Sequence, residues 1–464
     1  MTAREEMPGS LGGEIRAMLR LAVPVVVIQV GLMAMGVVDT IMVGHFTARA
    51  LAAVALGSFY FITVTVFGMG LLMALDPIVA QAVGAGDEPA VARGMQRGML
   101  LAVLLTVFST LLLMPSAPVL TFLRQPEDIV PIAASYVLVS IPGVFPFFVF
   151  LVLRQSLQAM RRVKPVVVTI LAANVANIFL NWILIFGKLG APALGAVGSG
   201  WASTISRWLM AAALLAMAWR PLRRFLVPPY EDALRLSAIV RMIRLGAPIG
   251  AQLQLEFGAF GVIALLMGWM GVMEMAAHQV AISLASFMFM VPVGVSAAAA
   301  VLVGHAVGRA DHAGVRRAAE AALICGGVFM AFSAVLLLTV PESLALLYTN
   351  DVPVAVLAAI LIPIAGIFQV FDGLQVVSVG ILRGLGDTIA PMVISVLGFW
   401  LIGLPIALYL GFGTGLGPVG LWWGLVAGLL AVAIFLLTRV RAQLAREVQR
   451  VVIDEDVVGG DYAT

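Results

Sequence analysis

The stretch "GLMAMGVVDTIMVG", from Gly31 to Gly44, lies inside a long apolar run of the sequence. Between Arg20 and His45 the only ionisable side chain is that of Asp39. About 20 apolar residues suffice for one helix to cross a bilayer, so this run predicts a membrane-spanning helix. Because an acid is costly inside a membrane, Asp39 is a candidate functional residue.

The composition of the whole chain supports a membrane protein. It is 62% hydrophobic and 11% charged, with a mean hydropathy of +1.10, far outside the range of soluble domains. Cys325 is the only cysteine, which excludes a disulfide framework and a cysteine-based metal site. No small-residue cleavage motif follows the first apolar run, so we do not expect a signal peptide.

We predict an all-α integral membrane protein, because the apolar runs are long and show no strand-like alternation. Twelve membrane-spanning helices are expected, at residues 18–44, 51–82, 95–116, 129–152, 164–187, 196–219, 240–270, 275–306, 316–340, 353–380, 389–411 and 418–439. All but four of the 27 Lys and Arg residues fall at the N-terminus, in even-numbered connections or in the C-terminal tail; the exceptions are Arg49, Arg124, Lys188 and Arg207. The positive-inside rule therefore places both termini in the cytoplasm.

The two halves of the chain resemble each other. "RLAVP" (from Arg20) and "RLGAP" (from Arg244) are 224 residues apart, as are "AVGAGD" (from Ala82) and "AVGRAD" (from Ala306). "LQAMRRVKP" parallels "LRGLGDTIAP", and "GAVGSGW" parallels "GPVGLWW". Six helices per repeat bring both repeats into the membrane with the same orientation, related by a pseudo-two-fold axis along the membrane normal.

This repeat sets the expected domain organisation. We expect an N-terminal six-helix lobe at 1–220, a cytoplasmic linker at 221–239, a C-terminal six-helix lobe at 240–440 and a solvated cytoplasmic tail at 441–464. Two parallel six-helix lobes are the arrangement of an alternating-access transporter, although the architecture alone names no substrate.

Polar residues of the first lobe gather at one expected depth. At about 1.5 Å per residue, counting from the nearest cytoplasmic basic residue puts Asp39, Asn181 and Ser203 at the same level in the outer half of the bilayer. Asn177 is one turn from Asn181 on the same helix face, and Asn174 is one turn below Asn177. The alternative is that these amides and the hydroxyl join helices structurally.

A second group of polar residues is expected in the second lobe. Glu256 and Asp372 lie on different predicted helices at nearly equal depth. Gln252 is one turn from Glu256, and Gln369 is three residues from Asp372. Asp76 and Arg207 also lie inside predicted spans, at depths that would let them pair structurally.

Buried, closely spaced carboxyl groups can hold a proton near neutral pH or share a small hard cation such as Na⁺. They can also neutralise an organic cation, but not while they hold a proton. Mutually exclusive occupancy of one charged site is the simplest chemistry of an antiporter. A structural role for Asp39, such as a hydrogen bond at a helix kink, is the alternative.

Several motifs resemble the multidrug and toxic compound extrusion (MATE) family over about residues 15–440. They are "VVDTIMVGHF" (from Val37), "NIFLNWILIFGKLG" (from Asn177), "AAHQVAISLASFMFMVPVGVSAAAAVLVG" (from Ala276) and "LRGLGDT" (from Leu382). Glu256 and Asp372 resemble the NorM-like bacterial branch. Asp76 departs from the family pattern, in which a neutral residue is expected at this position.

The resemblance implies a V-shaped pair of six-helix lobes that exports cationic amphiphilic drugs and dyes in exchange for H⁺ or Na⁺, and so confers antibiotic resistance. Asp39, Asn177, Asn181 and Ser203 would form the first-lobe site, and Glu256 with Asp372 the second-lobe cation site, with Na⁺ as its candidate metal. It further implies a multi-pass protein of the bacterial inner membrane, expected to be a monomer.

Other function classes remain as alternatives. A lipid-linked oligosaccharide flippase of the same superfamily would need a basic cavity for its anionic substrate, whereas the charges expected in this membrane region are mainly acidic. A membrane-embedded enzyme is less favoured, because no His-Glu-x-x-His, Gly-x-Ser-x-Gly or nucleotide-binding Gly-x4-Gly-Lys-Ser/Thr motif is present. We expect no cofactor, no nucleotide and no nucleic-acid partner.

Overall fold

The computed structural model describes residues 10–454, and within this range it is built of helices without a strand. The helices of the first half are α1 (Leu11–Gly44), α2 (Ala48–Leu72), α3 (Leu75–Ala85), α4 (Glu88–Leu113), α5 (Ser116–Phe122), α6 (Val130–Ser140), η1 (Ile141–Gly143), α7 (Val144–Ala159), α8 (Lys164–Phe186), α9 (Ala196–Leu226) and η2 (Glu231–Leu234).

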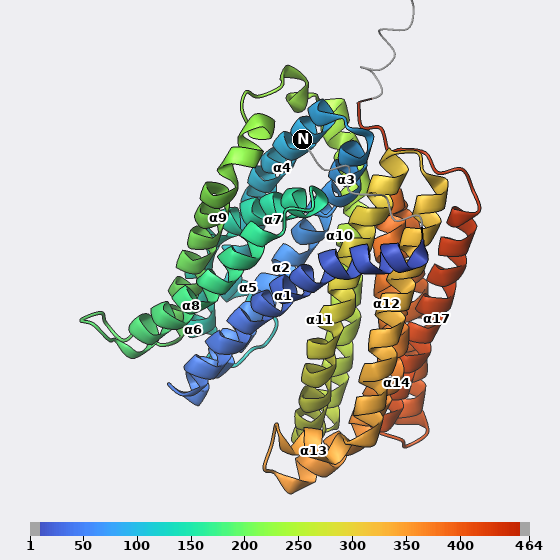
Figure 1. Ribbon diagram of the computed structural model, residues 1–464. Coiled ribbons are helices and arrows are strands. Elements are labelled where there is room, and N and C mark those ends of the chain that lie inside the picture. Colours follow the sequence, from blue (N-terminus) through green and yellow to red (C-terminus); the bar gives the residue numbers. More distant parts are fainter. Residues whose placement is uncertain (1–9, 455–464) are drawn as a thin grey trace, which may run out of the picture. The chain divides into compact units, whose positions relative to one another are not determined.

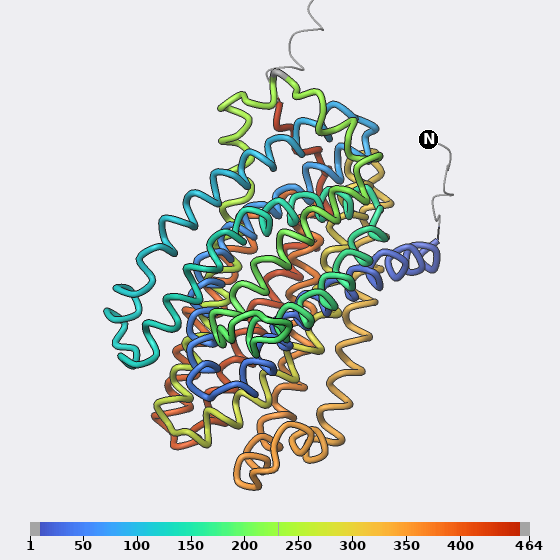
Figure 2. The backbone as a smooth tube through the Cα atoms, turned by 90° about the vertical axis from the view of Figure 1, so that its left-hand side faces the viewer, coloured from blue at the N-terminus to red at the C-terminus, as the bar shows by residue number. Residues whose placement is uncertain are grey.

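The second half begins with α10 (Leu236–Met270) and α11 (Val272–Gly308). It continues with α12 (His312–Thr339), α13 (Pro341–Leu346), α14 (Val352–Leu385), α15 (Ile389–Ser395), η3 (Val396–Gly403), α16 (Leu404–Leu408), η4 (Tyr409–Gly413) and α17 (Pro418–Leu444). The segments η3 and η4 are π-helical. Figure 2 traces the path of the chain through these helices.

Twelve helical segments of the described chain are long and apolar enough to cross a membrane. Three of them are built from more than one element: α2 with α3, α6 with η1 and α7, and α15 with η3, α16 and η4. The predicted all-helical membrane fold with twelve spans is therefore confirmed. Several helices extend beyond the predicted spans, and the fourth continues to Ala159 rather than ending at 152.

The described chain divides into two compact units. We call residues 27–250 with 452–454 the N-unit, and residues 10–26 with 251–451 the C-unit. The proposed linker at 221–239 comprises the end of α9, η2 and the start of α10, and all of it belongs to the N-unit. Figure 1 shows α7, α8 and α9 packed together in the N-unit, and α11, α12, α14 and α17 in the C-unit.

Equivalent turns close equivalent helices in the two halves. The amide of Asp87 donates to the carbonyl of Ala82, and the amide of Asp311 donates to that of Ala306, each at 2.9 Å. Both aspartates then cap the next helix through a side-chain oxygen, at 2.9 Å from the amide nitrogen of Ala90 and 2.8 Å from that of Gly314. These are the turns of the repeated "AVGAGD" and "AVGRAD" motifs, so the sequence repeat is also a repeat of local structure.

Glycine permits a close helix crossing inside each unit. In the N-unit, a Cβ atom at Gly70 would lie 2.5 Å from the Cα atom of Gly250. In the C-unit, a Cβ atom at Gly294 would lie 3.0 Å from the backbone nitrogen of Val26. Gly294 is 224 residues after Gly70, and Gly250 is 224 residues after Val26. The two crossings are therefore equivalent positions of the internal repeat.

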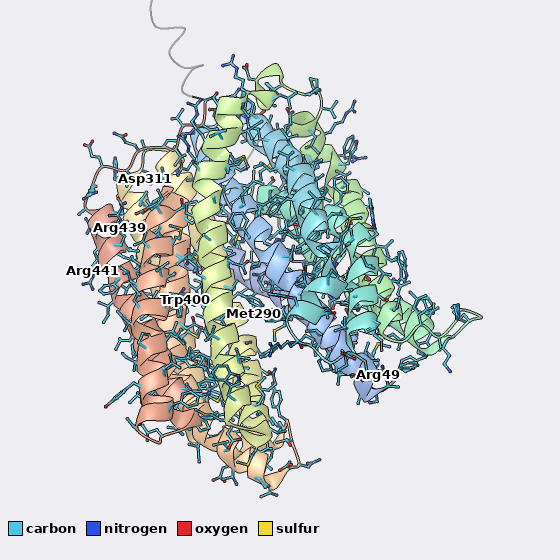
Figure 3. All side chains as sticks on the ribbon, turned by 180° about the vertical axis from the view of Figure 1, so that it is seen from behind. Arg49, Met290, Asp311, Trp400, Arg439 and Arg441 are labelled. Carbon is cyan, nitrogen blue, oxygen red and sulfur yellow. The ribbon has the colours of Figure 1, made fainter. Side chains whose placement is uncertain are left out.

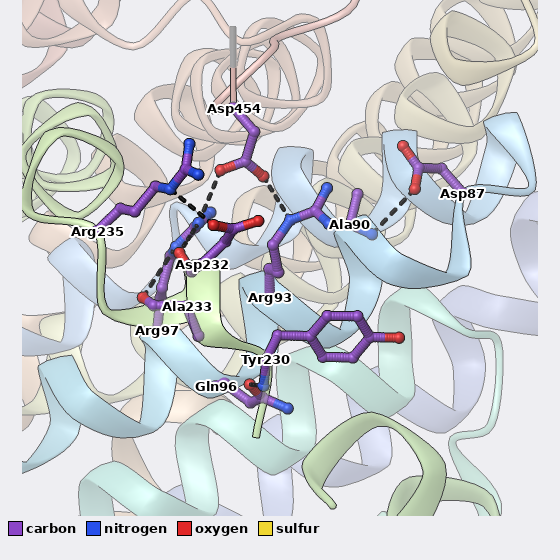
Figure 4. A network of polar contacts seen from close by, with 10 residues as sticks. All are labelled: Asp87, Ala90, Arg93, Gln96, Arg97, Tyr230, Asp232, Ala233, Arg235 and Asp454. Carbon is purple, nitrogen blue, oxygen red and sulfur yellow. Dashed lines mark hydrogen bonds and ion pairs between the residues drawn. The ribbon is translucent and has the colours of Figure 1, made fainter. Parts of the chain in front are cut away.

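The tail makes specific contacts up to its last described residue. Asp454 is 8% exposed and pairs with Nε of Arg93 and Nη2 of Arg97, each at 2.7 Å, as Figure 4 shows. Arg97 also donates to the backbone carbonyls of Asp232 and Ala233. The expectation of a solvated tail is wrong for Asp454, because the buried guanidinium of Arg97 and the partly buried one of Arg93 hold its carboxylate. Residues 455–464 lie outside the described range.

Candidate functional site

The carboxylate of Asp39 lies inside the N-unit and is held by two donors. Asn181 on α8 donates to Oδ1 and Ser203 on α9 donates to Oδ2, each at 2.5 Å. Asp39 is 7% exposed, Ser203 is 5% exposed and Asn181 is fully buried. Each carboxylate oxygen thus accepts one hydrogen bond, which stabilises a buried negative charge. The structure brings these three residues together, as their common depth predicted.

The other two asparagines of α8 differ in their contacts. Asn177 is fully buried, and its Oδ1 accepts a hydrogen bond of 3.1 Å from Nδ2 of Asn181. Asn177 therefore orients the amide that binds Asp39. Asn174 instead donates to the backbone carbonyl of Gly31 and to that of Ile170, each at 2.9 Å. It joins α8 to α1 below the carboxylate and does not contact Asp39 directly.

Arg207 is one turn beyond Ser203 on α9. Its guanidinium carbon lies 4.3 Å from the ring centre of Phe61 and 5.7 Å from that of Phe147. Its charge interacts electrostatically with the carboxylate of Asp39. The structural pairing of Arg207 with Asp76 that a common depth suggested stays a prediction. Asp76 is 2% exposed on α3.

A second carboxylate group lies inside the C-unit. Oε1 of Glu256 on α10 accepts a hydrogen bond of 3.2 Å from Nε2 of Gln375 on α14. Asp372, also on α14, is 5% exposed and interacts electrostatically with Glu256. Oδ1 of Asp372 and Oε1 of Gln375 are buried and have no hydrogen-bond partner in the described chain. These two buried acceptor oxygens, one on Asp372 itself and one on Gln375, suit a proton or a small cation.

The two other predicted residues of this group are not equivalent. Gln252 is buried on α10, one turn before Glu256. Gln369 is fully buried and its amide is already used, because it accepts from Ser333 at 2.6 Å and donates to the carbonyl of Ala285 at 2.8 Å. Gln369 therefore joins α14 to α12 and α11, while Gln252 remains a candidate.

An irregular helix supports α10 beside Glu256. Nε1 of Trp400, in the π-helical segment η3, donates to the carbonyl of Leu255 at 3.1 Å. Figure 3 labels Trp400 among the side chains of the C-unit. Single π-helical turns are common at functional sites. This contact fixes the backbone next to the acid.

Sequence reasoning missed two residues of these groups. Gln375 is three residues after Asp372, so helical spacing could have placed it on the same face. Tyr136 on α6 is 5% exposed, interacts electrostatically with Asp39 and accepts a hydrogen bond from Ser58 at 3.0 Å. A lone tyrosine in an apolar helix carries no signal of this kind, because most such rings only pack.

A family model, MatE, matches residues 24–183 and 248–409. The chain belongs to the MatE family. The NorM multidrug resistance protein of Photobacterium profundum is 35% identical over 438 residues, covering 92% of this chain and 95% of that protein. A probable NorM protein of Rhizobium meliloti is 36% identical over 428 residues, covering 91% and 92%.

Solved MATE structures share the fold. The eukaryotic transporter AtDTX14 has a TM-score of 0.85 at 22% identity, covering 93% of this chain and 96% of its own. The Vibrio cholerae transporter VcmN in its bent form has a TM-score of 0.83 at 19% identity, covering 94% and 98%. The family resemblance read from the sequence is therefore confirmed.

The Asp39 group and the Glu256 group of this MatE chain differ in whether their buried oxygens have hydrogen-bond donors. Both oxygens of Asp39 have donors, whereas the Glu256 group contains buried oxygens without one. No cluster of three or more His, Cys, Asp or Glu side chains able to hold a metal ion occurs in residues 10–454. A cation at the second group would therefore take its ligands from two carboxylates and from neutral oxygens such as that of Gln375.

Proposed function

We propose that this chain is a secondary active antiporter that exports cationic amphiphilic drugs and dyes in exchange for inward H⁺, Na⁺ or both. The observation that carries the proposal is the buried carboxyl group of Asp39, which accepts hydrogen bonds from Asn181 and Ser203. An acid in a membrane interior is costly and marks an ion or substrate pathway, and its carboxylate can bind either a proton or an organic cation. The multidrug resistance proteins at about 35% identity support this reading.

Proton exchange at Asp39 follows from the chemistry of its two donors. The amide nitrogen of Asn181 can only donate, so a proton on Oδ1 would face another donor. The hydroxyl of Ser203 can either donate or accept. A proton therefore binds on Oδ2 while the Ser203 hydroxyl turns to accept from it. Loss of that proton restores the ionised carboxylate for the next organic cation.

The group around Glu256 and Asp372 is our candidate for the inorganic ion. Two acids whose charges interact, with two buried oxygens lacking donors, favour Na⁺ or a shared proton. Sequential use of the two groups would let either ion drive export. On this proposal the protein works as a monomer in the bacterial inner membrane, with both termini in the cytoplasm.

The two alternative functions find less support. A flippase for an anionic lipid-linked oligosaccharide would need a basic site, whereas both groups described above contain carboxylates. A membrane-embedded enzyme is disfavoured because the chain is a member of a transporter family.

Dye efflux from vesicles tests the proposal under separately imposed pH and Na⁺ gradients. We expect efflux driven by at least one gradient, and we expect Asp39→Asn to abolish the proton-driven part. Unchanged proton-driven efflux in that variant would remove Asp39 from the mechanism.

A further inference from the structure

Arg207 is a buried cation held by aromatic rings rather than by an acid. Its guanidinium lies over the faces of Phe61 on α2 and Phe147 on α7. Cation–π contacts of this kind stabilise a guanidinium without removing its charge. The positive charge of Arg207 therefore remains available to act on groups nearby.

The residues around Arg207 leave room for its guanidinium but give one of its nitrogens no hydrogen-bond acceptor. A Cβ atom at Gly143, in the η1 segment, would lie 3.2 Å from both Cδ and Nη1 of Arg207, so a larger residue there would crowd the side chain. Nη1 is buried and has no hydrogen-bond partner among residues 10–454. An unused buried donor is costly, so this placement needs a reason beyond packing.

Asp39 is the acid on which this charge acts. Ser203 and Arg207 are four residues apart on α9 and so share one face of the helix. The first donates to Asp39, and the second interacts electrostatically with the same carboxylate. Tyr136 on α6 is the other titratable group that interacts with both charges.

The other elements packed on α9 direct neutral groups toward this region. They are Asn177 and Asn181 on α8, Ser58 and Phe61 on α2, Phe147 on α7 and Gly143 in η1. The charged residues of these elements make other contacts or lie at helix ends: Arg49 of α2 pairs with Asp128, Glu88 of α4 pairs with Arg224, Arg93 and Arg97 of α4 pair with Asp454, Arg154 of α7 donates to Gln29, and Lys164 is the first residue of α8. Arg207 is thus the cation that interacts with Asp39 inside the N-unit.

We propose that Arg207 is the resident counter-ion of Asp39 and that it selects organic cations of single charge over those of double charge. This inference rests on the proposed function. With Arg207 present, the empty site carries no net charge, and each positive charge that enters is repelled by the guanidinium. The repulsion weakens binding enough for release, and it acts twice on a dication.

The same repulsion acts on a proton bound to Asp39. Removing the guanidinium charge therefore strengthens the binding of protons and of organic cations alike. At a saturating concentration of a singly charged cation the two gains cancel, so the pH at which protons displace it changes little, whereas a doubly charged cation gains more and is displaced at a lower pH. A change in packing would not alter binding affinity in proportion to the charge of the organic cation.

Binding of two probes to the purified full-length protein tests this inference. Tetraphenylphosphonium carries one positive charge and methyl viologen carries two. A unit charge at about 12 Å, acting through an effective dielectric near 20, changes affinity by about tenfold. In Arg207→Gln we expect tetraphenylphosphonium to bind about tenfold more tightly and methyl viologen about a hundredfold more tightly at alkaline pH. Arg207→Lys keeps the charge and should bind both as the wild type does.

Three outcomes separate the possible failures. Equal changes for the two probes, or no change in Arg207→Gln, would overturn the counter-ion role. Arg207→Met serves as a second neutral variant, and failure of both neutral variants to fold would also overturn it, because Arg207 would then be structural. If Asp39→Asn binds tetraphenylphosphonium as the wild type does, the proposed function itself fails at this site.

Discussion

The hydroxyl of Ser203 donates a hydrogen bond of 2.5 Å to Oδ2 of Asp39, from a residue 164 positions later in the chain. This contact joins α9 to α1 inside the N-unit. Replacing Ser203 by Ala leaves one oxygen of a buried carboxylate without a donor. Losing such a donor costs about 1–3 kcal/mol, or about a tenfold change in affinity.

We therefore expect Ser203→Ala to bind tetraphenylphosphonium about tenfold more weakly at neutral pH, because the ionised carboxylate is disfavoured. Equilibrium binding to the purified protein measures this change. Ser206→Ala is the matched control, because Ser206 is a fully buried serine of α9 without a hydrogen-bond partner in the described chain. Equal weakening in both variants would contradict a specific role for Ser203.

The acids of the C-unit should govern the response to the inorganic ion. Glu256→Gln and Asp372→Asn each remove one negative charge from a group that already contains buried acceptor oxygens. We expect each variant to lose at least about tenfold in Na⁺- or H⁺-driven dye efflux, since one charge of the pair is gone. Gln369→Ala is the control: it should lower thermal stability, because Ser333 loses its partner, but keep the ion dependence. Normal coupling in both acid variants would make this group structural.

The crossing of Gly70 and Gly250 should tolerate no side chain. A methyl group at Gly70 would lie 2.5 Å from Cα and 2.8 Å from the backbone nitrogen of Gly250, and both are backbone atoms that cannot rotate away. We expect Gly70→Ala to destabilise the protein by about 1–3 kcal/mol, measured as a lower melting temperature in detergent. Gly36→Ala is the control, because nothing lies within 4 Å of its added methyl group. A melting temperature unchanged from the wild type would argue against this close crossing.

The docked tail should respond to acid. Burial raises the pKa of Asp454, but hydrogen bonds and charges from Arg97 and Arg93 outweigh it and hold the pKa below its usual value. The docked state therefore binds a proton more weakly than the free tail does. Its stabilisation is complete above the ordinary aspartate pKa of about 4 and is lost as the pH falls through the lowered value.

Hydrogen exchange of the segment around Asp454 measures this docking. We expect slow exchange at neutral pH, faster exchange in Asp454→Asn at the same pH, and faster exchange of the wild type in strong acid. Glu447→Gln, which changes an exposed acid of the same tail, should exchange as the wild type does. Identical exchange in all three proteins would show that the arginines do not hold the tail.

Much of the fold and of the first site could be predicted, because the membrane imposes simple rules. The lengths of the apolar runs between charged or turn-rich breaks defined the spans, and depth counting grouped Asp39, Asn181 and Ser203 without knowledge of the fold. Depth does not specify which way a side chain points around its helix. For this reason Asn174 and Gln369 were grouped with site residues, although their amides bind backbone carbonyls and Ser333.

Features that depend on tertiary contact could not be predicted. The environment of Arg207 is made by the rings of Phe61 and Phe147. The sequence around each of these residues looks like that of an ordinary membrane-spanning helix. The docking of Asp454 depends on two arginines more than 350 residues earlier, at separations of 361 and 357. Neither relationship leaves a periodic pattern in the sequence.

Proton release on binding of an organic cation tests the central claim most directly. Calorimetric titration of tetraphenylphosphonium into the purified protein, repeated in two buffers of different ionisation enthalpy, measures that release. We predict that wild-type protein releases protons when the cation binds near the pH at which binding weakens, and that Asp39→Asn releases fewer or none. Binding with the same heat in both buffers, and alike in the wild type and in Asp39→Asn, would contradict exchange at this carboxylate.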